Sequence, residues 1–222
     1  MFIGHYAAGF AAKKLAPKTS LGLLFGAAVL LDLIWPLFVL LGLEHFNVAP
    51  GITKMSPFDF TDYPLSHSLV MSAVWGVGLG LIYVILKNDL KIGSILAGLV
   101  VSHWVLDLLV HRPDLPLLPA EVANFAPHKY GLALWNHWYL GLPLECALFA
   151  AGLWLYLKAT KATDKMGDLG LWAFVIFLLV TFAASLKGTP PSNPNIIAFA
   201  GQILQMGLVG WGFWFDSYRK PA

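Results

Sequence analysis

The sequence predicts an all-α membrane protein, a polytopic bundle of about six hydrophobic helices in a single domain that covers residues 1–222. Hydrophobic residues make up 58% of the chain and charged residues only 12%, about half of the charged share that is usual in soluble domains. Apolar runs of roughly 20 residues, long enough to cross about 30 Å of hydrocarbon, recur along the chain. No alternation of period two favours a membrane β-barrel.

The first long apolar run covers residues 21–43. It is too long for the core of a secretory signal, and no small-residue cleavage site follows it, so we interpret it as a retained span. Five further runs, separated by Pro, Gly, Asn and charged residues, lie at about 66–86, 92–111, 137–157, 169–186 and 195–215.

Residues 2–16 are apolar but too short for a comfortable span, and two arrangements remain open for them. A re-entrant helix that folds back about Pro17 places His5 beside Asp32. A helix that lies flat on the inner surface places Lys13 and Lys14 among the headgroups instead. The re-entrant form requires close packing, which a stripe of small residues permits. The stripe consists of Ala8, Gly9, Ala12 and Ala16.

Lys and Arg residues in the short connections predict the orientation. With a cytoplasmic N-terminus, the inner connections hold ten of them: Lys13, Lys14, Lys18, Lys87, Lys91, Lys158, Lys161, Lys165, Arg219 and Lys220. The outer connections hold four: Lys54, Arg112, Lys129 and Lys187. The sequence therefore predicts a multi-pass protein of a cytoplasmic membrane with both termini inside and the loops at about 44–65 and 112–136 outside.

Net charge and cysteine content exclude two classes of interaction. The formal charge is only +2, and no basic cluster with interleaved aromatic residues indicates nucleic-acid binding. The single Cys146 excludes an intrachain disulfide. The oligomeric state is not fixed by any pattern in the sequence.

Ionisable residues inside the predicted spans are the strongest functional signal, because such groups are costly in hydrocarbon unless they are paired. Asp32 lies in the first span and Glu145 in the fourth. His103, Asp107 and His111 follow one another at intervals of four residues in the third span, which places them along one side of a helix. Such a stripe is suited to ligating a metal. The alternative is an Asp that merely orients a His, with His111 at the membrane interface.

Depth along the helices strengthens the metal interpretation. At about 1.5 Å per residue, Asp32, His103 and a re-entrant His5 lie roughly 18–20 Å above the inner ends of their helices. Glu145 lies roughly 18 Å below the outer end of its helix. The four residues are therefore expected at one depth in the membrane. Asp107 and His67 are expected roughly 6–9 Å closer to the outer surface by the same rise. His67 follows Ser66 at the outer start of the second span, where a solvated His at a capped helix end is the alternative.

Four of these elements together resemble the bacterial membrane-bound metal-dependent hydrolases, over about residues 1–111. The elements are Gly4-His5, Asp32 in the next helix, Ser66-His67-Ser68 and His103-x-x-x-Asp107. The resemblance implies a divalent metal, zinc, and an arrangement similar to that of zinc-dependent phospholipase C. The ligands that it implies are His5, Asp32, His67, His103 and Asp107. The family often has a His-Arg pair before its Thr-His-Ser element, where this chain has Asp62-Tyr-Pro-Leu.

The leading functional hypothesis is a membrane-embedded metal-dependent hydrolase that acts on a phosphoester-type bond of a lipid or lipid-linked substrate at the outer half of the membrane. Zinc with an open position lowers the pKa of bound water towards 7. Asp107, Glu145 or His111 is then a candidate general base, and Arg112 a candidate partner for an anionic headgroup.

Two other hypotheses stay open. In a transport protein the same His and acidic residues would form a proton or metal-ion path, although the sequence shows no inverted repeat of the kind common in transporters. A non-catalytic accessory subunit or a haem-binding protein is the third hypothesis; haem ligation favours His pairs without so many carboxylates.

Overall fold

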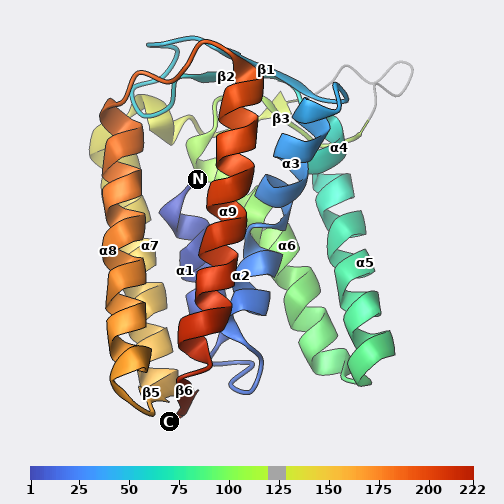
Figure 1. Cartoon of the computed structure of the whole chain (residues 1–222). Coiled ribbons are helices and arrows are strands. Elements are labelled where there is room, and N and C mark those ends of the chain that lie inside the picture. Colours follow the sequence, from blue (N-terminus) through green and yellow to red (C-terminus); the bar gives the residue numbers. More distant parts are fainter. Residues whose placement is uncertain (120–128) are drawn as a thin grey trace.

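The computed structural model describes residues 1–119 and 129–222 and has the predicted all-α bundle architecture (Figure 1). Five helices are long and apolar enough to cross a membrane: α5 (Leu69–Lys87), α6 (Leu90–Val110), α7 (Trp138–Ala159), α8 (Lys165–Lys187) and α9 (Pro194–Asp216). The bent pair α2 (Leu21–Ala28) and α3 (Leu30–Leu40) meets the same criterion. The described part of the chain thus contains five to six candidate spans, which confirms the predicted fold class.

The first span differs from the prediction because it is broken. Helices α2 and α3 meet at Val29 and bend by 56°. The carbonyl oxygen of Ala28, at the break, accepts a hydrogen bond of 2.9 Å from Nδ1 of His103. Sharp bends in helices commonly occur where a side chain bonds to the backbone in this way. The sequence pattern of one continuous apolar run does not reveal this partner, which comes from a distant helix.

Helix α1 (Ile3–Ala12) lies inside the bundle, and eight of its ten residues are buried. It packs against α7 so closely that a Cβ added to Gly152 would lie 2.4 Å from the carbonyl oxygen of Ala7. The ring of Phe10 contacts those of Phe25 and Tyr156, with centroids 4.9 and 5.1 Å away. The structure therefore has the re-entrant arrangement, and the surface-helix alternative is wrong.

A buried ion pair fixes the far end of α1. Nζ of Lys13 lies 2.5 Å from Oδ2 of Asp216 and donates to the carbonyl of Thr19 at 2.7 Å. The same carboxylate accepts from the amide of Leu21 and the hydroxyl of Tyr156. Asp216 of α9 thus connects the end of α1 with α2 and α7, and Lys13 is buried instead of lying among the headgroups as expected.

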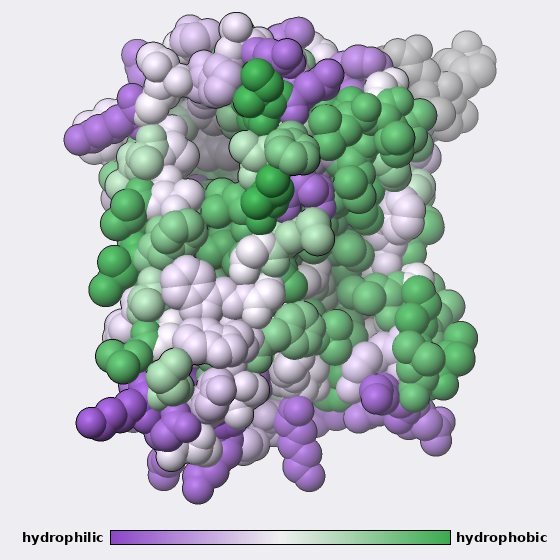
Figure 2. Space-filling view, in the orientation of Figure 1, coloured by the Kyte–Doolittle hydropathy of each residue, from purple (hydrophilic) through white to green (hydrophobic). Residues whose placement is uncertain are grey.

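The basic residues gather at one end of the bundle. The connections α1–α2, α5–α6 and α7–α8 lie at this end together with the C-terminus, where β5 (Thr160–Ala162) pairs with β6 (Arg219–Pro221) (Figure 1). Figure 2 shows hydrophilic residues at both ends of the molecule and a mainly apolar belt between them. Met1 lies inside the bundle, 6% exposed, so of the two termini only the C-terminus lies at the basic end.

Short elements cover the opposite end. They are the antiparallel hairpin of β1 (His45–Val48) and β2 (Phe58–Asp62), helix α4 (Pro64–His67), the pair of β3 (Leu115–Pro116) and β4 (Lys129–Tyr130), and the 3-10 helix η1 (Leu134–Asn136). The predicted loop at about 112–136 belongs to this end. Residues 120–128 of that loop, which include His128, lie outside the described residues.

Candidate metal centre

Two imidazoles and two carboxylates meet where the α2–α3 break, α4 and α6 come together. Oδ1 of Asp32 lies 3.6 Å from Nε2 of both His67 and His103. Oδ2 of Asp107 lies 3.3 Å from Nε2 of His103 and 3.9 Å from Nε2 of His67. A tetrahedral zinc ion with bonds of roughly 2.0–2.1 Å separates its ligand atoms by roughly 3.3 Å. The spacing of these four side chains is therefore close to that of a zinc site.

The hydrogen bonding of His103 determines which of its ring nitrogens carries the proton and which faces the cluster. The side chain is fully buried, and its Nδ1 bonds to the Ala28 carbonyl, which can only accept, so Nδ1 carries a proton. Nε2 has no hydrogen-bond partner among the described residues. In a neutral ring, Nε2 therefore directs its lone pair at two carboxylates. A cation between these atoms would turn the arrangement from repulsive to attractive.

His67 is oriented in the same manner by a different partner. Its Nδ1 lies 2.8 Å from Oγ of Ser66, and the Ser66 hydroxyl donates to Oε2 of Glu44 at 2.6 Å. Ser66 therefore accepts a proton from Nδ1 of His67, which leaves Nε2 free to face the cluster. A second partner that fixes the tautomer is typical of metal-binding histidines. The structure thus presents two histidines with Nε2 directed at the same pair of carboxylates.

Glu44 is one of two residues at the site that the sequence pattern does not single out. It is fully buried and also accepts from the backbone amides of Leu65 and Ser66 at 2.7 and 2.8 Å. Burial raises the pKa of the Glu44 carboxyl, and the hydrogen bonds from Ser66 and Leu65 offset part of that effect. Glu44 lies just beyond the first span, so neither its spacing nor its place in an apolar run distinguishes it.

The second oxygen of Asp32 is held by α9. Nε2 of Gln205 donates to Oδ2 of Asp32 at 3.4 Å, and Oε1 of Gln205 accepts a hydrogen bond from the Tyr6 hydroxyl. Gln205 was also missed, although a polar residue within the apolar run at 195–215 was an available signal. These contacts fix which oxygen of Asp32 faces the two imidazoles.

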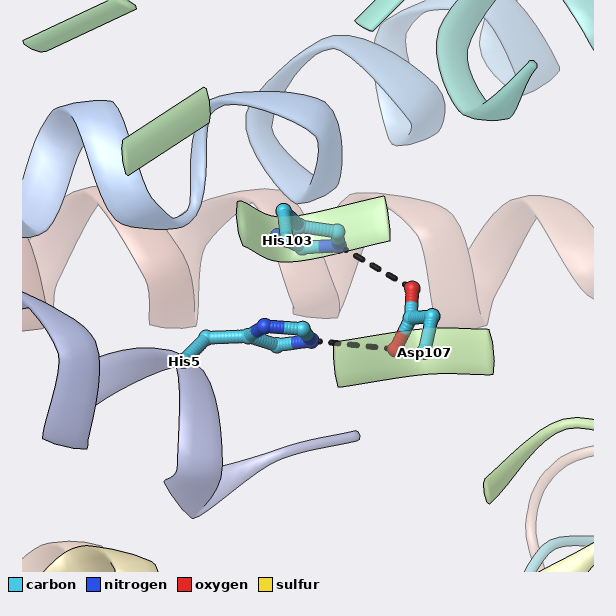
Figure 3. A group of neighbouring side chains, drawn as sticks. All are labelled: His5, His103 and Asp107. Carbon is cyan, nitrogen blue, oxygen red and sulfur yellow. Dashed lines mark hydrogen bonds and ion pairs between the residues drawn. The ribbon is translucent and has the colours of Figure 1, made fainter. Parts of the chain in front are cut away.

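His5 lies against the other side of the cluster. Its ring stacks on that of His103 with centroids 3.6 Å apart and planes within 3° (Figure 3). Its Nε2 lies 3.1 Å from Oδ1 of Asp107 (Figure 3), the oxygen that the Met1 amino group also contacts. The structure therefore pairs His5 with Asp107 and His103, and among the described residues it makes no hydrogen bond or ion pair with Asp32, the neighbour expected from the hairpin geometry.

These side chains form two overlapping groups that could hold a metal ion. One consists of Asp32, His67 and His103, and the other of His5, His103 and Asp107. All five residues that the resemblance implies as ligands thus lie in one cluster. In the first group both histidines have Nδ1 bonded elsewhere, whereas Nδ1 of His5 has no hydrogen-bond partner among the described residues. The first group is the better organised of the two.

His111 lies beside Asp107, as the predicted stripe requires, although it caps α6 instead of lying within it. Helix α6 ends at Val110, and His111 is its C-cap with extended backbone angles. Pro113 follows closely and disfavours helical conformation at Arg112. From the cap position, Nε2 of His111 still lies 3.9 Å from Oδ1 of Asp107, and Nδ1 lies 3.0 Å from Asp114.

Glu145 and Arg112 have partners of their own. Oε2 of Glu145 accepts from the amides of Phe2 and Gly4 at 2.9 and 3.4 Å, so this buried carboxylate caps the start of α1. Such a position is favourable because the amino end of a helix is positive. The Arg112 guanidinium pairs with Asp59 at 2.6 Å and with Asp114 at 3.6 Å. Arg112 thereby ties the β1–β2 hairpin to the end of α6.

Tyr63 connects the hairpin to the same region. Its hydroxyl donates to Asp114 at 3.1 Å. Burial, reinforced by the Asp114 carboxylate, raises the pKa of Tyr63 well above its usual value of about 10. The hydroxyl therefore stays protonated and remains a donor.

A cavity of about 400 Å³ adjoins the cluster. Ionisable side chains form one part of its wall: Asp32, His67, Asp107, His111 and Glu145. Aromatic side chains form another: Phe2, Trp35, Phe58, Phe60, Trp135 and Phe182. Among the described residues, no lysine or arginine lines it. Concave, mostly apolar pockets with a few converging polar groups are the usual form of ligand sites.

No family model matches the chain, and neither the curated proteins nor the solved structures yield a match to it. The structure itself shows a bundle with five to six apolar helices of membrane-spanning length and two His/Asp groups that could bind a metal ion.

Proposed function

We propose that this protein is a membrane-embedded, zinc-dependent hydrolase that cleaves a phosphoester-type bond of a lipid or lipid-linked substrate. One observation carries the proposal: His67 and His103 each use Nδ1 for another bond and direct Nε2 at Asp32 and Asp107. The resemblance of residues 1–111 to bacterial membrane-bound metal-dependent hydrolases points in the same direction. It is also the basis for placing the protein in a bacterial cytoplasmic membrane.

Asp32, His67 and His103 are the residues that we assign to holding the metal. A divalent cation in such a site lowers the pKa of water towards 7 and polarises the phosphoryl oxygen. Asp107 has its Oδ1 occupied by His5 and the Met1 amino group, which leaves Oδ2 beside the imidazoles. This oxygen is well placed to accept a proton from a water molecule, and we assign Asp107 as a ligand or as the general base.

His111 and Glu145 are secondary candidates for proton transfer, since both line the cavity. The hydrogen bonds of Glu145 to the start of α1 favour a role in holding that helix. Arg112 forms an ion pair with Asp59, so we assign it the role of holding the hairpin. The negative charge of a phosphoryl group would then be neutralised by the metal. The basic end of the bundle would face the cytoplasm, which places the cluster in the outer half of the membrane.

A transport function is the alternative, and the broken first span is the observation that favours it. Transporters often bind ions at discontinuous helices, but these commonly occur in pairs related by an internal repeat. Only one bent pair, α2 and α3, is found among the described residues. Accumulation of zinc in sealed vesicles, with no cleavage of lipid, would support the transporter.

The direct test of the hydrolase is release of a water-soluble phosphorylated headgroup from radiolabelled phospholipid vesicles that contain the purified protein. We expect zinc-dependent release that a chelator abolishes. Asp107→Asn should lower the rate by about 10²–10⁴-fold, the range for loss of a general base. His137→Ala, at an exposed position next to η1, is the matched control and should leave the rate unchanged. Zinc-loaded protein that releases no headgroup from a panel of phospholipids would count against this function.

A further inference from the structure

The cavity is continuous with the space between α8 and α9. Side chains of Thr181, Phe182, Ser185 and Leu186 on α8 line it from one side, and Leu204 on α9 lines it from the other. Figure 2 shows that the molecular face is hollowed over the upper halves of these two helices, above the basic end. The metal centre is therefore reached from a face that the membrane would cover.

The two helices contact each other mainly at the opposite end. There, Gly170 of α8 admits the side chains of Trp214 and Phe215, since a Cβ on this glycine would lie within 3 Å of both. The ring of Phe174 packs against that of Trp211 with centroids 5.9 Å apart. In the described structure, the ring contacts between α8 and α9 extend from this end only as far as Phe177, at the middle of α8. The helices thus close near the cytoplasmic end and leave an opening beside the cavity.

The end of the bundle above the cavity is covered. Met55, Ser56, Pro57 and Phe58 of the β1–β2 hairpin line the cavity from this end. We call the hairpin, residues 45–62, the roof. Arg112 anchors the roof through its ion pair with Asp59, and the amide of Lys54 donates to the Trp135 carbonyl at 3.1 Å. These bonds hold the roof in place and favour access through the side opening.

The depth of the opening suits a membrane lipid. Thr181 lies six residues before the end of α8 at Lys187, hence about 9 Å below that end at about 1.5 Å per residue. Asp107 and His103 lie three and seven residues before the end of α6 at Val110, roughly 5 and 10 Å below it. The opening and the metal centre therefore share the zone in which headgroups give way to hydrocarbon chains.

The surface of the opening suits a hydrocarbon chain. The hydroxyls of Thr181 and Ser185 are already bonded to the carbonyls of Phe177 and Phe182 within α8, so they require no partner from a ligand. The other side chains at the opening, Phe182, Leu186 and Leu204, are apolar. An acyl chain that moves from the bilayer into this opening exchanges one apolar surrounding for another, so the move requires no polar group to lose its partner.

We propose that the ligand of this cavity is a membrane amphiphile that enters sideways between α8 and α9, with its hydrocarbon chain in the opening and its polar group at the metal centre. This inference rests on the proposed function only for the identity of the reacting bond. The route itself can be tested in protein from which all metal has been removed, so failure of the hydrolase and failure of the route are distinguishable.

The test uses vesicles of phosphatidylethanolamine and phosphatidylglycerol in which a small share of the phosphatidylglycerol carries a photoactivatable diazirine near the middle of one acyl chain. After illumination of the chelator-treated protein, mass spectrometry locates the labelled residues. We expect labels on Phe2 and Phe182, which face the cavity and contact each other at 6.1 Å between ring centroids. Labels on lipid-facing positions such as Val180, which is 63% exposed, confirm that the reagent is active.

Two variants at the opening test the route. Ser185→Trp and Thr181→Trp should each reduce labelling of Phe2 severalfold, because the larger side chain fills the space between the helices. Val180→Trp on the exposed face of α8 is the matched control and should leave it unchanged. Labelling of Val180 without labelling of Phe2 in the unmodified protein would overturn the proposal, as would full labelling of Phe2 in both variants.

Discussion

At the scale of single residues, the tautomer of two histidines is the feature on which the metal centre depends. His103 is fixed by a backbone carbonyl at the helix break, and His67 by a relay through Ser66 to Glu44. Both partners lie outside the set of residues that would contact the metal. Such partners orient the ligand nitrogen and raise its basicity.

Glu44→Gln should weaken zinc binding by about 10–100-fold, the usual effect of losing a partner of a metal-binding histidine. The amide group of Gln would donate to Oγ of Ser66, so that the Ser66 hydroxyl turns to donate to Nδ1 of His67. The proton of His67 would then move to Nε2, which could no longer bind a metal. Competition with a chromophoric chelator measures the affinity.

Asp62→Asn is the control for that substitution, because Asp62 is an exposed carboxylate on β2 that pairs with the exposed His45. It should leave zinc affinity unchanged. The thermal unfolding of metal-free Glu44→Gln should also stay close to that of the unmodified protein. Unaltered zinc affinity in Glu44→Gln would show that the relay does not set the tautomer of His67.

The sequence reveals some of these residues and hides others for physical reasons. His103 and Asp107 stand out because ionisable groups four residues apart in an apolar run must lie on one side of a helix. Glu44 has no such signal, since it reaches the site only through the tertiary position of the α3–α4 connection. His111 follows the same spacing, and from the C-cap of α6 its Nε2 lies 3.9 Å from Oδ1 of Asp107.

At the scale of elements, the position of α1 decides whether His5 can reach the centre. The helix is apolar on nearly all sides, which suits a helix enclosed by other helices. Its small residues permit close approach, and a Cβ added to Gly152 of α7 would lie 2.4 Å from the carbonyl oxygen of Ala7. The sequence leaves the re-entrant helix open beside a surface helix, and the structure shows the re-entrant form with His5 stacked on His103.

Gly152→Ala should destabilise the protein by about 1–3 kcal/mol, the usual cost of excess volume in a packed interior. The added Cβ would lie 2.4 Å from the Ala7 carbonyl oxygen, so α1 has to move away from α7. Thermal unfolding in detergent measures the effect. The movement would also separate His5 from Asp107, so zinc affinity should fall together with stability.

Gly207→Ala on α9 is the matched control, since a Cβ there meets no atom within 4 Å in the described structure. Alanine is a better helix former than glycine by about 0.8–1.0 kcal/mol. This variant should therefore be as stable as the unmodified protein or more so. Equal stability of the two variants would contradict the close packing of α1 against α7.

At the scale of the whole molecule, hydrophobic patterning predicts the fold well, because a membrane leaves few alternatives to a helical bundle. The five long helices match the predicted runs to within a few residues at most boundaries. Hydrophobic patterning does not predict the contacts between segments that are far apart in the sequence. The bend between α2 and α3, the roof and the opening between α8 and α9 all depend on contacts between residues far apart in the sequence.

The cavity depends on single side chains, on the packing of two helices and on the arrangement of the whole bundle. Its polar wall includes Asp32, His67 and Asp107 of the cluster, and its aromatic wall comes from the roof and from several helices. Its opening lies beyond the ring contacts between α8 and α9, which extend from the basic end to the middle of α8.

The central claim is that the buried cluster binds a divalent metal, and elemental analysis combined with zinc X-ray absorption tests it most directly. Protein purified in detergent without added metal should contain stoichiometric zinc, with a spectrum that shows imidazole and carboxylate ligands and no sulfur. His103→Ala should lose the metal, whereas His45→Ala and His137→Ala, at exposed positions, should retain it. Folded protein that contains no zinc or other divalent metal, or a folded His103→Ala variant that retains its full content, would contradict the claim.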